Sequence, residues 1–80
     1  MKTITLYTKP DCPLCEKAEA VLHELQREIP FRLEKIDITR DERLFELYRY
    51  EIPVIAINGQ EVCRYCVDKE SLRAVLKKAR

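Results

Sequence analysis

The chain has 80 residues, of which 15 are lysine or arginine and 14 are aspartate or glutamate, so its formal net charge is +1. This balance gives no reason to expect a nucleic acid or an anionic membrane as a partner. No apolar run approaches the ~18 residues of a membrane-spanning helix, and the N-terminus lacks a signal-peptide pattern. We therefore expect one cytoplasmic domain over residues 1–80, with one modest core. We expect a monomer because no long apolar stripe is left over.

The first part of the chain alternates between strand and helix patterns. Residues from Thr3 to Thr8 alternate apolar with polar side chains and are rich in β-branched types, which predicts a strand. Apolar residues then recur at helical spacing over 13–28, and Pro30 ends that helix. A second strand is predicted from Phe31 to Asp37.

The second helix is predicted to open with a capping box, Thr39-Arg40-Asp41-Glu42, and to run to about Tyr50. Its apolar face is formed by Leu44, Leu47 and Tyr48. We interpret Tyr48 and Tyr50 as packing residues rather than as a platform for a substrate.

The last part of the chain predicts a hairpin followed by a helix. The apolar run from Val54 to Ile57 indicates a strand covered on both faces. Asn58-Gly59 is a strong hairpin signal, and Glu61 to Cys66 forms the returning strand. Asp68 caps a final helix whose inward residues are Leu72, Val75, Leu76 and Ala79. The predicted fold class is therefore α/β, in the order βαβαββα, with a four-stranded mixed sheet flanked by three helices and a parallel first crossover.

The segment between the first strand and the first helix contains the residues that we expect to be reactive. Cys12 stands at the predicted helix N-terminus and Pro13 takes the first helical position, where its missing N–H costs nothing. Cys15 follows three residues later, so both sulfurs fall on one helix face, with Cα atoms about 5–5.5 Å apart, within the range of a disulfide. A helix N-terminus stabilises a thiolate, and Lys9 adds positive charge nearby.

A stabilised thiolate at Cys12 favours disulfide exchange over one-way nucleophilic attack. Lowering a thiol pKa from ~8.5 to ~7 raises the thiolate fraction about 16-fold at neutral pH. A thiolate of lower pKa is also a weaker nucleophile, which reduces the gain in attack rate by roughly fivefold. The larger gain is that Cys12 becomes a good leaving group when Cys15 attacks it. We expect a thiol–disulfide oxidoreductase that needs no metal or organic cofactor.

Three segments resemble conserved parts of a known family. Tyr7-Thr8-Lys9-Pro10-Asp11-Cys12-Pro13-Leu14-Cys15 is similar to the active-site stretch of glutaredoxins. Ile52-Pro53-Val54 matches the Val-Pro segment of that family, and Asn58-Gly59-Gln60 matches its hairpin. The chain resembles, over nearly its whole length, the short glutaredoxin-like branch of the thioredoxin superfamily. The resemblance implies a thioredoxin-like fold.

The resemblance also implies roles for individual residues. Cys12 would be the nucleophile and Cys15 the resolving thiol, while Lys9 would meet a carboxylate of glutathione. Pro53 would be cis, and the backbone of Ile52 would pair with the bound peptide. The expected substrate-binding surface comprises Lys9, Pro13, Leu14, Ile52 and Pro53.

Two departures from the family pattern concern glutathione. Leu14 stands where glutaredoxins commonly have a tyrosine, and Cys63-Arg64 stands where they have a Gly-Gly pair. The expected partner is a disulfide-containing protein or a glutathione mixed disulfide, with glutathione as a co-substrate. One alternative is a thioredoxin-like electron donor that a protein reductase reduces without glutathione. Another is a thioredoxin-fold binding module without turnover, or a metal-handling module.

The second cysteine pair, Cys63 and Cys66, repeats the spacing of the first. Two such pairs can supply the four thiolates of a zinc site. Residues three apart on a strand point to opposite faces, which argues against shared chelation. We interpret this pair as structural or incidental thiols and predict no metal site. A further hypothesis rests on the resemblance: Cys63 takes the Gly-Gly position, beside the active site, and would act as an auxiliary thiol.

Overall fold

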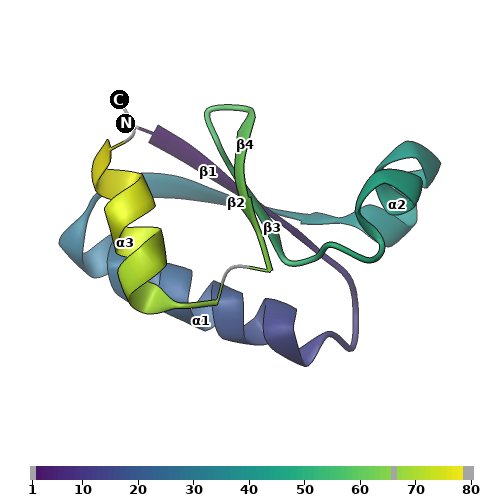
Figure 1. Cartoon of the computed structure of the whole chain (residues 1–80), viewed down its shortest axis with the longest axis horizontal. Helices are drawn as coiled ribbons and strands as arrows, with labels where there is room; N and C mark the ends of the chain where they lie inside the picture. The colour runs from purple at the N-terminus through teal and green to yellow at the C-terminus, as the bar shows by residue number, and fades with distance from the viewer. Residues whose placement is uncertain (1, 66, 79–80) are drawn as a thin grey trace.

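The computed structural model describes residues 2–65 and 67–78, and its elements follow the predicted order with one short 3-10 turn added (Figure 1). The strands are β1 (Lys2–Thr8), β2 (Phe31–Asp37), β3 (Val54–Ile57) and β4 (Gln60–Arg64). The helices are α1 (Pro13–Glu28), α2 (Glu42–Tyr48) and α3 (Lys69–Lys78), and the 3-10 turn is η1 (Ile38–Arg40). None of the helices in these two ranges is long and apolar enough to cross a membrane.

The sheet is four-stranded and mixed, as predicted, with the strand order β2-β1-β3-β4. β1 pairs in parallel with β2 and antiparallel with β3, and β3 pairs antiparallel with β4. β1 lies inside the sheet: its ladder with β2 runs to Thr8, and its ladder with β3 runs to Tyr7. The loop that carries Cys12 leaves from that end of the strand.

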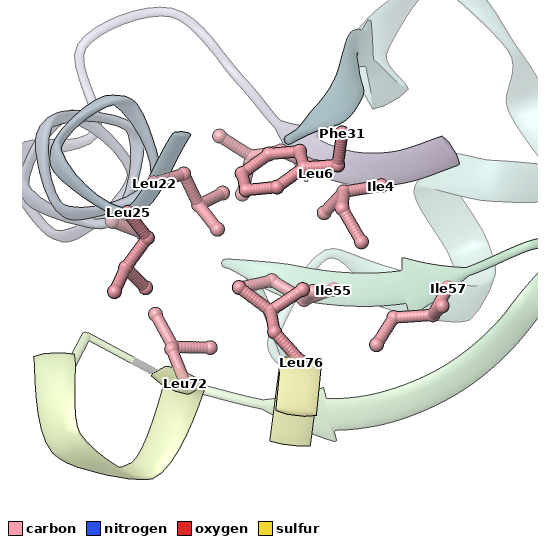
Figure 2. Close-up of a cluster of buried hydrophobic side chains, with 10 residues drawn as sticks. Ile4, Leu6, Leu22, Leu25, Phe31, Ile55, Ile57, Leu72 and Leu76 are labelled. Atoms are coloured by element: carbon pink, nitrogen blue, oxygen red, sulfur yellow. The ribbon is translucent and has the colours of Figure 1, made fainter. Parts of the chain in front are cut away.

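Strand alternation divides the apolar side chains of the sheet between two clusters. Leu6 and Ile55, which are opposite each other in the ladder, belong to the main core with α1 and α3 (Figure 2). Tyr7 and Val54 form the next pair and therefore point to the opposite face, where they pack with residues of α2. Figure 1 shows α1 and α3 together on one side of the sheet and α2 near its far end. All four residues of β3 are buried, as its apolar run predicted.

The predicted start of α2 is wrong by two residues. Thr39 lies in η1, where its N–H and hydroxyl both donate to the carboxylate of Asp37, at 2.9 and 2.6 Å. Asp41 is the residue that caps α2, because its carboxylate accepts the N–H groups of Arg43 at 2.9 Å and Leu44 at 3.2 Å. Two aspartates close together therefore divide the segment into a 3-10 turn and a short helix.

Replacing Asp41 with alanine should destabilise the protein by about 1 kcal/mol, because two N–H groups of α2 lose their acceptor. Chemical denaturation in urea would show this as a lower midpoint with an unchanged slope. Asp41→Asn keeps an acceptor oxygen at the cap and is the matched control, with a smaller loss. Equal stability of the alanine variant and the parent protein would contradict the capping role.

β4 ends at Arg64, earlier than the predicted limit at Cys66. Tyr65 has φ 59°, in the left-handed region, which turns the chain out of the ladder direction. The predicted strand end at Cys66 and the predicted inward residue Ala79 lie outside the described residues. The predicted cap of α3 is confirmed, because the carboxylate of Asp68 accepts the N–H of Ser71 at 2.9 Å.

Candidate active site

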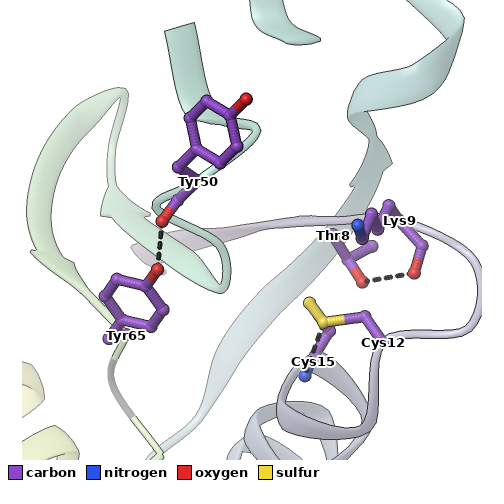
Figure 3. Close-up of a disulfide and its surroundings, with 6 residues drawn as sticks. All are labelled: Thr8, Lys9, Cys12, Cys15, Tyr50 and Tyr65. Carbon is purple, nitrogen blue, oxygen red and sulfur yellow. Dashed lines mark hydrogen bonds between the residues drawn. A yellow bond between two sulfur atoms is a disulfide. The ribbon is translucent and has the colours of Figure 1, made fainter.

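The two cysteines of the first pair lie at the N-terminus of α1, as the sequence predicted. Pro13 opens the helix, and Cys12 is its N-cap residue. The Sγ atom of Cys12 accepts the backbone N–H of Cys15 at 3.3 Å (Figure 3). The two residues form a disulfide with their Cα atoms 5.2 Å apart, within the predicted range. The helix therefore presents one of its free N–H groups and the positive end of its dipole to Cys12.

The two sulfur-bearing residues differ in their access to solvent. Cys12 is half-buried, whereas Cys15 is 1% exposed. Cys15 is packed in the second cluster, together with Tyr48, Ile52 and Val54. A large substrate can therefore reach Cys12 before it can reach Cys15.

The Ile52–Pro53 segment lies against the same cluster, and its peptide bond is cis, as the resemblance implied. Both side chains are buried, so only the backbone of this segment is available to a bound peptide. The N–H of Ile52 donates to the carbonyl of Tyr48 at 3.2 Å, and the carbonyl of Pro53 accepts the N–H of Tyr65 at 2.8 Å. A peptide that pairs with the Ile52 N–H has to replace the bond to Tyr48.

Lys9 lies on the rim of a polar cleft of about 290 Å³ next to the cysteine loop. The cleft is lined by Thr8, Lys9, Pro10, Asp11, Glu16, Glu19, Lys35 and Asp37. Among these described residues, four carboxylates stand against two ammonium groups, so the lining carries a formal excess of negative charge. This excess opposes the binding of an anionic ligand beside Lys9.

Two of these carboxylates are held in their ionised form by their neighbours. Thr39 lowers the pKa of Asp37 through hydrogen bonds from its hydroxyl and its backbone N–H. Burial alone raises the pKa of Glu19, but the hydrogen bond and the charge of Lys35, whose Nζ lies 3.2 Å from Oε1, contribute to a net lowering. Neither group takes up a proton near neutral pH, so the acidic character of the cleft persists there.

The family of the chain follows from its sequence as a whole. Residues 3–77 match the model of the family described as Glutaredoxin-like domain (DUF836). The chain belongs to this family. The resemblance to the glutaredoxin-like branch is thereby confirmed, and the paired cysteines indicate a redox function in general terms.

Relatives of this glutaredoxin-like chain include proteins named for thioredoxin. A Probable Thioredoxin of Archaeoglobus fulgidus is 30% identical over 81 residues, which cover 98% of this chain and 89% of that protein. An X-ray structure of an X. campestris protein has a TM-score of 0.80 at 31% identity, covering 96% of this chain and 99% of that one. Mitochondrial thioredoxin 3 of Saccharomyces cerevisiae, at 17% identity, has a TM-score of 0.74 and covers 98% of this chain and 78% of its own. The last comparison shows the thioredoxin fold alone.

Cys63 lies away from the cluster that holds Cys15 in the glutaredoxin-like fold. It pairs with Ile55 in the ladder and packs, half-buried, against the main core of α1 and α3. Cys63 is part of a disulfide in the structure, so it would have to be reduced before it could act as an auxiliary thiol. That role stays a prediction for disulfide mapping, and Cys66 lies outside the described residues. Within the described ranges, no group of three or more histidine, cysteine or acidic residues has the geometry of a metal site.

Two exposed tyrosines near the disulfide were not predicted as site residues. Tyr48 packs in the second cluster as expected, but the packing interpretation of Tyr50 is wrong, because its side chain is 70% exposed. Tyr65 is 55% exposed, and its hydroxyl donates to the carbonyl of Tyr50 (Figure 3). The sequence gives no periodic signal for either, because both lie between regular elements. The remaining predicted site residues, Pro13 and Leu14, are exposed beside Cys12.

Proposed function

We propose that this glutaredoxin-like protein catalyses dithiol–disulfide exchange through Cys12 and Cys15. The observation that carries the proposal is the position of Cys12 as the N-cap of α1, with its Sγ atom accepting the Cys15 N–H at 3.3 Å. In the reduced protein the same N–H and the helix dipole stabilise the Cys12 thiolate. The thiolate is the nucleophile in disulfide exchange.

The first step forms a mixed disulfide. The Cys12 thiolate attacks one sulfur of a substrate disulfide, forming a new S–S bond to that sulfur. The substrate S–S bond breaks, and its other sulfur leaves as a thiolate, which takes up a proton from solvent. Half-buried Cys12 meets the substrate, while Cys15 stays behind it in the second cluster.

The second step resolves the mixed disulfide. The Cys15 thiol loses its proton and attacks the Sγ of Cys12, forming the Cys12–Cys15 disulfide and expelling the second substrate sulfur as a thiolate. The substrate has then gained two electrons, and the protein has lost two. The Cα separation of 5.2 Å lies within the range of a disulfide, so this bond needs no backbone movement.

The protein returns to its dithiol form by accepting two electrons from two external thiol groups, which are oxidised to a disulfide. Glutathione and a protein dithiol both supply such electrons. The acidic cleft beside Lys9 and the absence of a Gly-Gly pair favour the protein dithiol, as does the likeness to a Probable Thioredoxin. A thioredoxin-like donor is therefore the second candidate function.

Titration of the reduced, metal-free protein with oxidised glutathione, followed by intact mass and peptide mapping, tests the proposal. We expect a disulfide between Cys12 and Cys15. A transient glutathione adduct on Cys12 supports a glutaredoxin-like exchanger. Slow oxidation by glutathione, with rapid cycling by a protein reductase, supports the thioredoxin-like donor. Cysteines 12 and 15 that remain reduced under every disulfide oxidant would contradict the exchange function and favour a binding module.

A further inference from the structure

Large apolar side chains are exposed at two points next to the reactive disulfide. In the part of the chain that the structure describes, those with high exposure are Leu14, Leu47, Tyr50, Val62 and Tyr65. Leu14 lies between the two cysteines, and Tyr50 and Tyr65 lie around the Ile52–Pro53 segment. Single exposed apolar residues need no explanation, but a group beside a reactive bond marks an interaction surface.

The two tyrosines are held in place although they are exposed. The backbone N–H of Tyr65 donates to the Pro53 carbonyl at 2.8 Å, and its hydroxyl donates to the Tyr50 carbonyl. The guanidinium of Arg49 lies 4.6 Å from the centre of the Tyr50 ring and also donates to the Tyr50 hydroxyl. We call this pair, Tyr50 and Tyr65, the tyrosine strap. Aromatic rings fixed before binding lose little conformational entropy when a partner covers them.

The backbone of Tyr65 is a second sign of a functional role. Its φ of 59° is uncommon for a bulky residue, and surrounding contacts must maintain such a conformation. Residues held in this way cluster at ligand clamps and active sites. The hydrogen bonds of Tyr65 to the carbonyl groups of Tyr50 and Pro53 contribute to holding it in this conformation.

Charge and polarity together select the occupant of this surface. Glutathione is small, carries two carboxylates against one ammonium group and has no large apolar side chain. The cleft beside Lys9 already carries an excess of carboxylates, and the strap offers aromatic area that glutathione cannot cover. In the view of Figure 3, the two tyrosines lie on one side of the disulfide, and Thr8 and Lys9 lie on the other. A polypeptide that reaches Cys12 has neighbouring side chains that can cover the strap.

We propose that the tyrosine strap and Leu14 form the docking surface for a protein disulfide whose cysteine has apolar neighbours, in preference to glutathione. This inference rests on the proposed exchange function and adds the substrate class of the same site. The apolar neighbours of the substrate cysteine contact the rings while Cys12 attacks its sulfur. The strap is then a specificity determinant that takes no part in the electron transfer.

The test uses three thiols, each joined in a mixed disulfide to the same chromogenic aryl thiol. They are a synthetic peptide with leucine on both sides of its cysteine, the same peptide with glycine at both places, and glutathione. Attack by Cys12 on the peptide or glutathione sulfur releases the coloured aryl thiolate, so single-turnover rates are read directly. For the parent protein we expect the highest second-order rate constant with the leucine peptide.

Tyr65→Gly is the most informative variant, because glycine adopts a φ of 59° without strain and keeps the N–H that bonds to Pro53. We expect its rate with the leucine peptide to fall roughly tenfold, equivalent to about 1.4 kcal/mol, and by more than its rate with glutathione. Tyr50→Ala, an independent removal of the other ring, should show the same selective loss. Leu47→Ala is the matched control, because Leu47 is 57% exposed on α2 and contributes nothing to the strap.

The outcomes separate the inference from the function on which it rests. An equal loss with all three thiols in Tyr65→Gly and Tyr50→Ala would overturn the docking role, as would a parent protein that prefers glutathione. A parent protein that releases no aryl thiolate from any of the three would contradict the exchange function itself. A loss confined to the leucine peptide, with Leu47→Ala unchanged, supports the inference.

Discussion

Replacing Cys12 with serine is expected to reduce disulfide exchange to the uncatalysed rate. A hydroxyl cannot form the mixed disulfide, and Cys15 cannot substitute because it is 1% exposed and packed in the second cluster. Serine is also a good N-cap, so its oxygen can accept the Cys15 N–H and keep the start of α1 intact. The loss of activity is therefore chemical rather than structural. Turnover of a protein disulfide, with circular dichroism as the check on folding, measures it.

Cys15→Ser is the matched variant and should fail at a different step. Cys12 still attacks the substrate, but nothing resolves the mixed disulfide, so the substrate stays bound to Cys12. Intact mass should then show a stable adduct in Cys15→Ser and none in Cys12→Ser. The reverse pattern, with the adduct on Cys15, would assign the nucleophile to the other cysteine. Full turnover in Cys15→Ser would mean that the resolving step does not depend on Cys15.

Leu22→Ala is expected to cause the largest loss of stability among single changes in the main core. Leu22 is fully buried on α1, and it packs with residues of the sheet in the cluster of Figure 2. Removing its branched end costs about 2–5 kcal/mol, from lost burial and the cavity left behind. A domain of this size has a total stability of only about 4–12 kcal/mol. The variant should melt roughly 10–30 °C lower than the parent protein.

The control for this change is Lys17→Ala, an exposed position on the same helix. Its effect should lie within about 0.5 kcal/mol, because alanine favours helices and no core contact is lost. Thermal unfolding followed by circular dichroism gives both values. Similar melting temperatures for Leu22→Ala and Lys17→Ala would mean that the helix packs less tightly than the structure shows.

The regular elements of the fold could be predicted because their patterns are local. The helical spacing and the proline signals placed α1 at 13–28, and the apolar run placed β3 at 54–57, both with the observed bounds. The start of α2 was wrong because the carboxylate of Asp37 binds Thr39 in a 3-10 turn and Asp41 caps the helix, an arrangement that a capping-box pattern does not resolve. The end of β4 was wrong because the left-handed conformation of Tyr65 has no signature in its residue type.

The residues of the candidate site were predictable only where their spacing in the sequence indicates a reaction, as it does for two cysteines three residues apart. The paired cysteines and Pro13 were found from the sequence, and the cis bond at Pro53 came from the family resemblance alone. The exposed pair Tyr50 and Tyr65 was missed, because a hydrogen bond between residues 15 positions apart creates it. The acidic cleft was also missed, because it is lined by side chains of the cysteine loop, α1 and β2, which are far apart in the sequence.

The position of Cys12 at the start of α1 links the redox state to the helix. A thiolate accepts a hydrogen bond more strongly than a neutral disulfide sulfur, because a charged acceptor makes the stronger bond. The N–H of Cys15 and the helix dipole therefore stabilise the reduced form more than the oxidised form. By thermodynamic linkage, this difference raises the reduction potential of the pair. The N–H of Cys15, in the first turn of α1, thus helps to set the reduction potential of the cysteine pair.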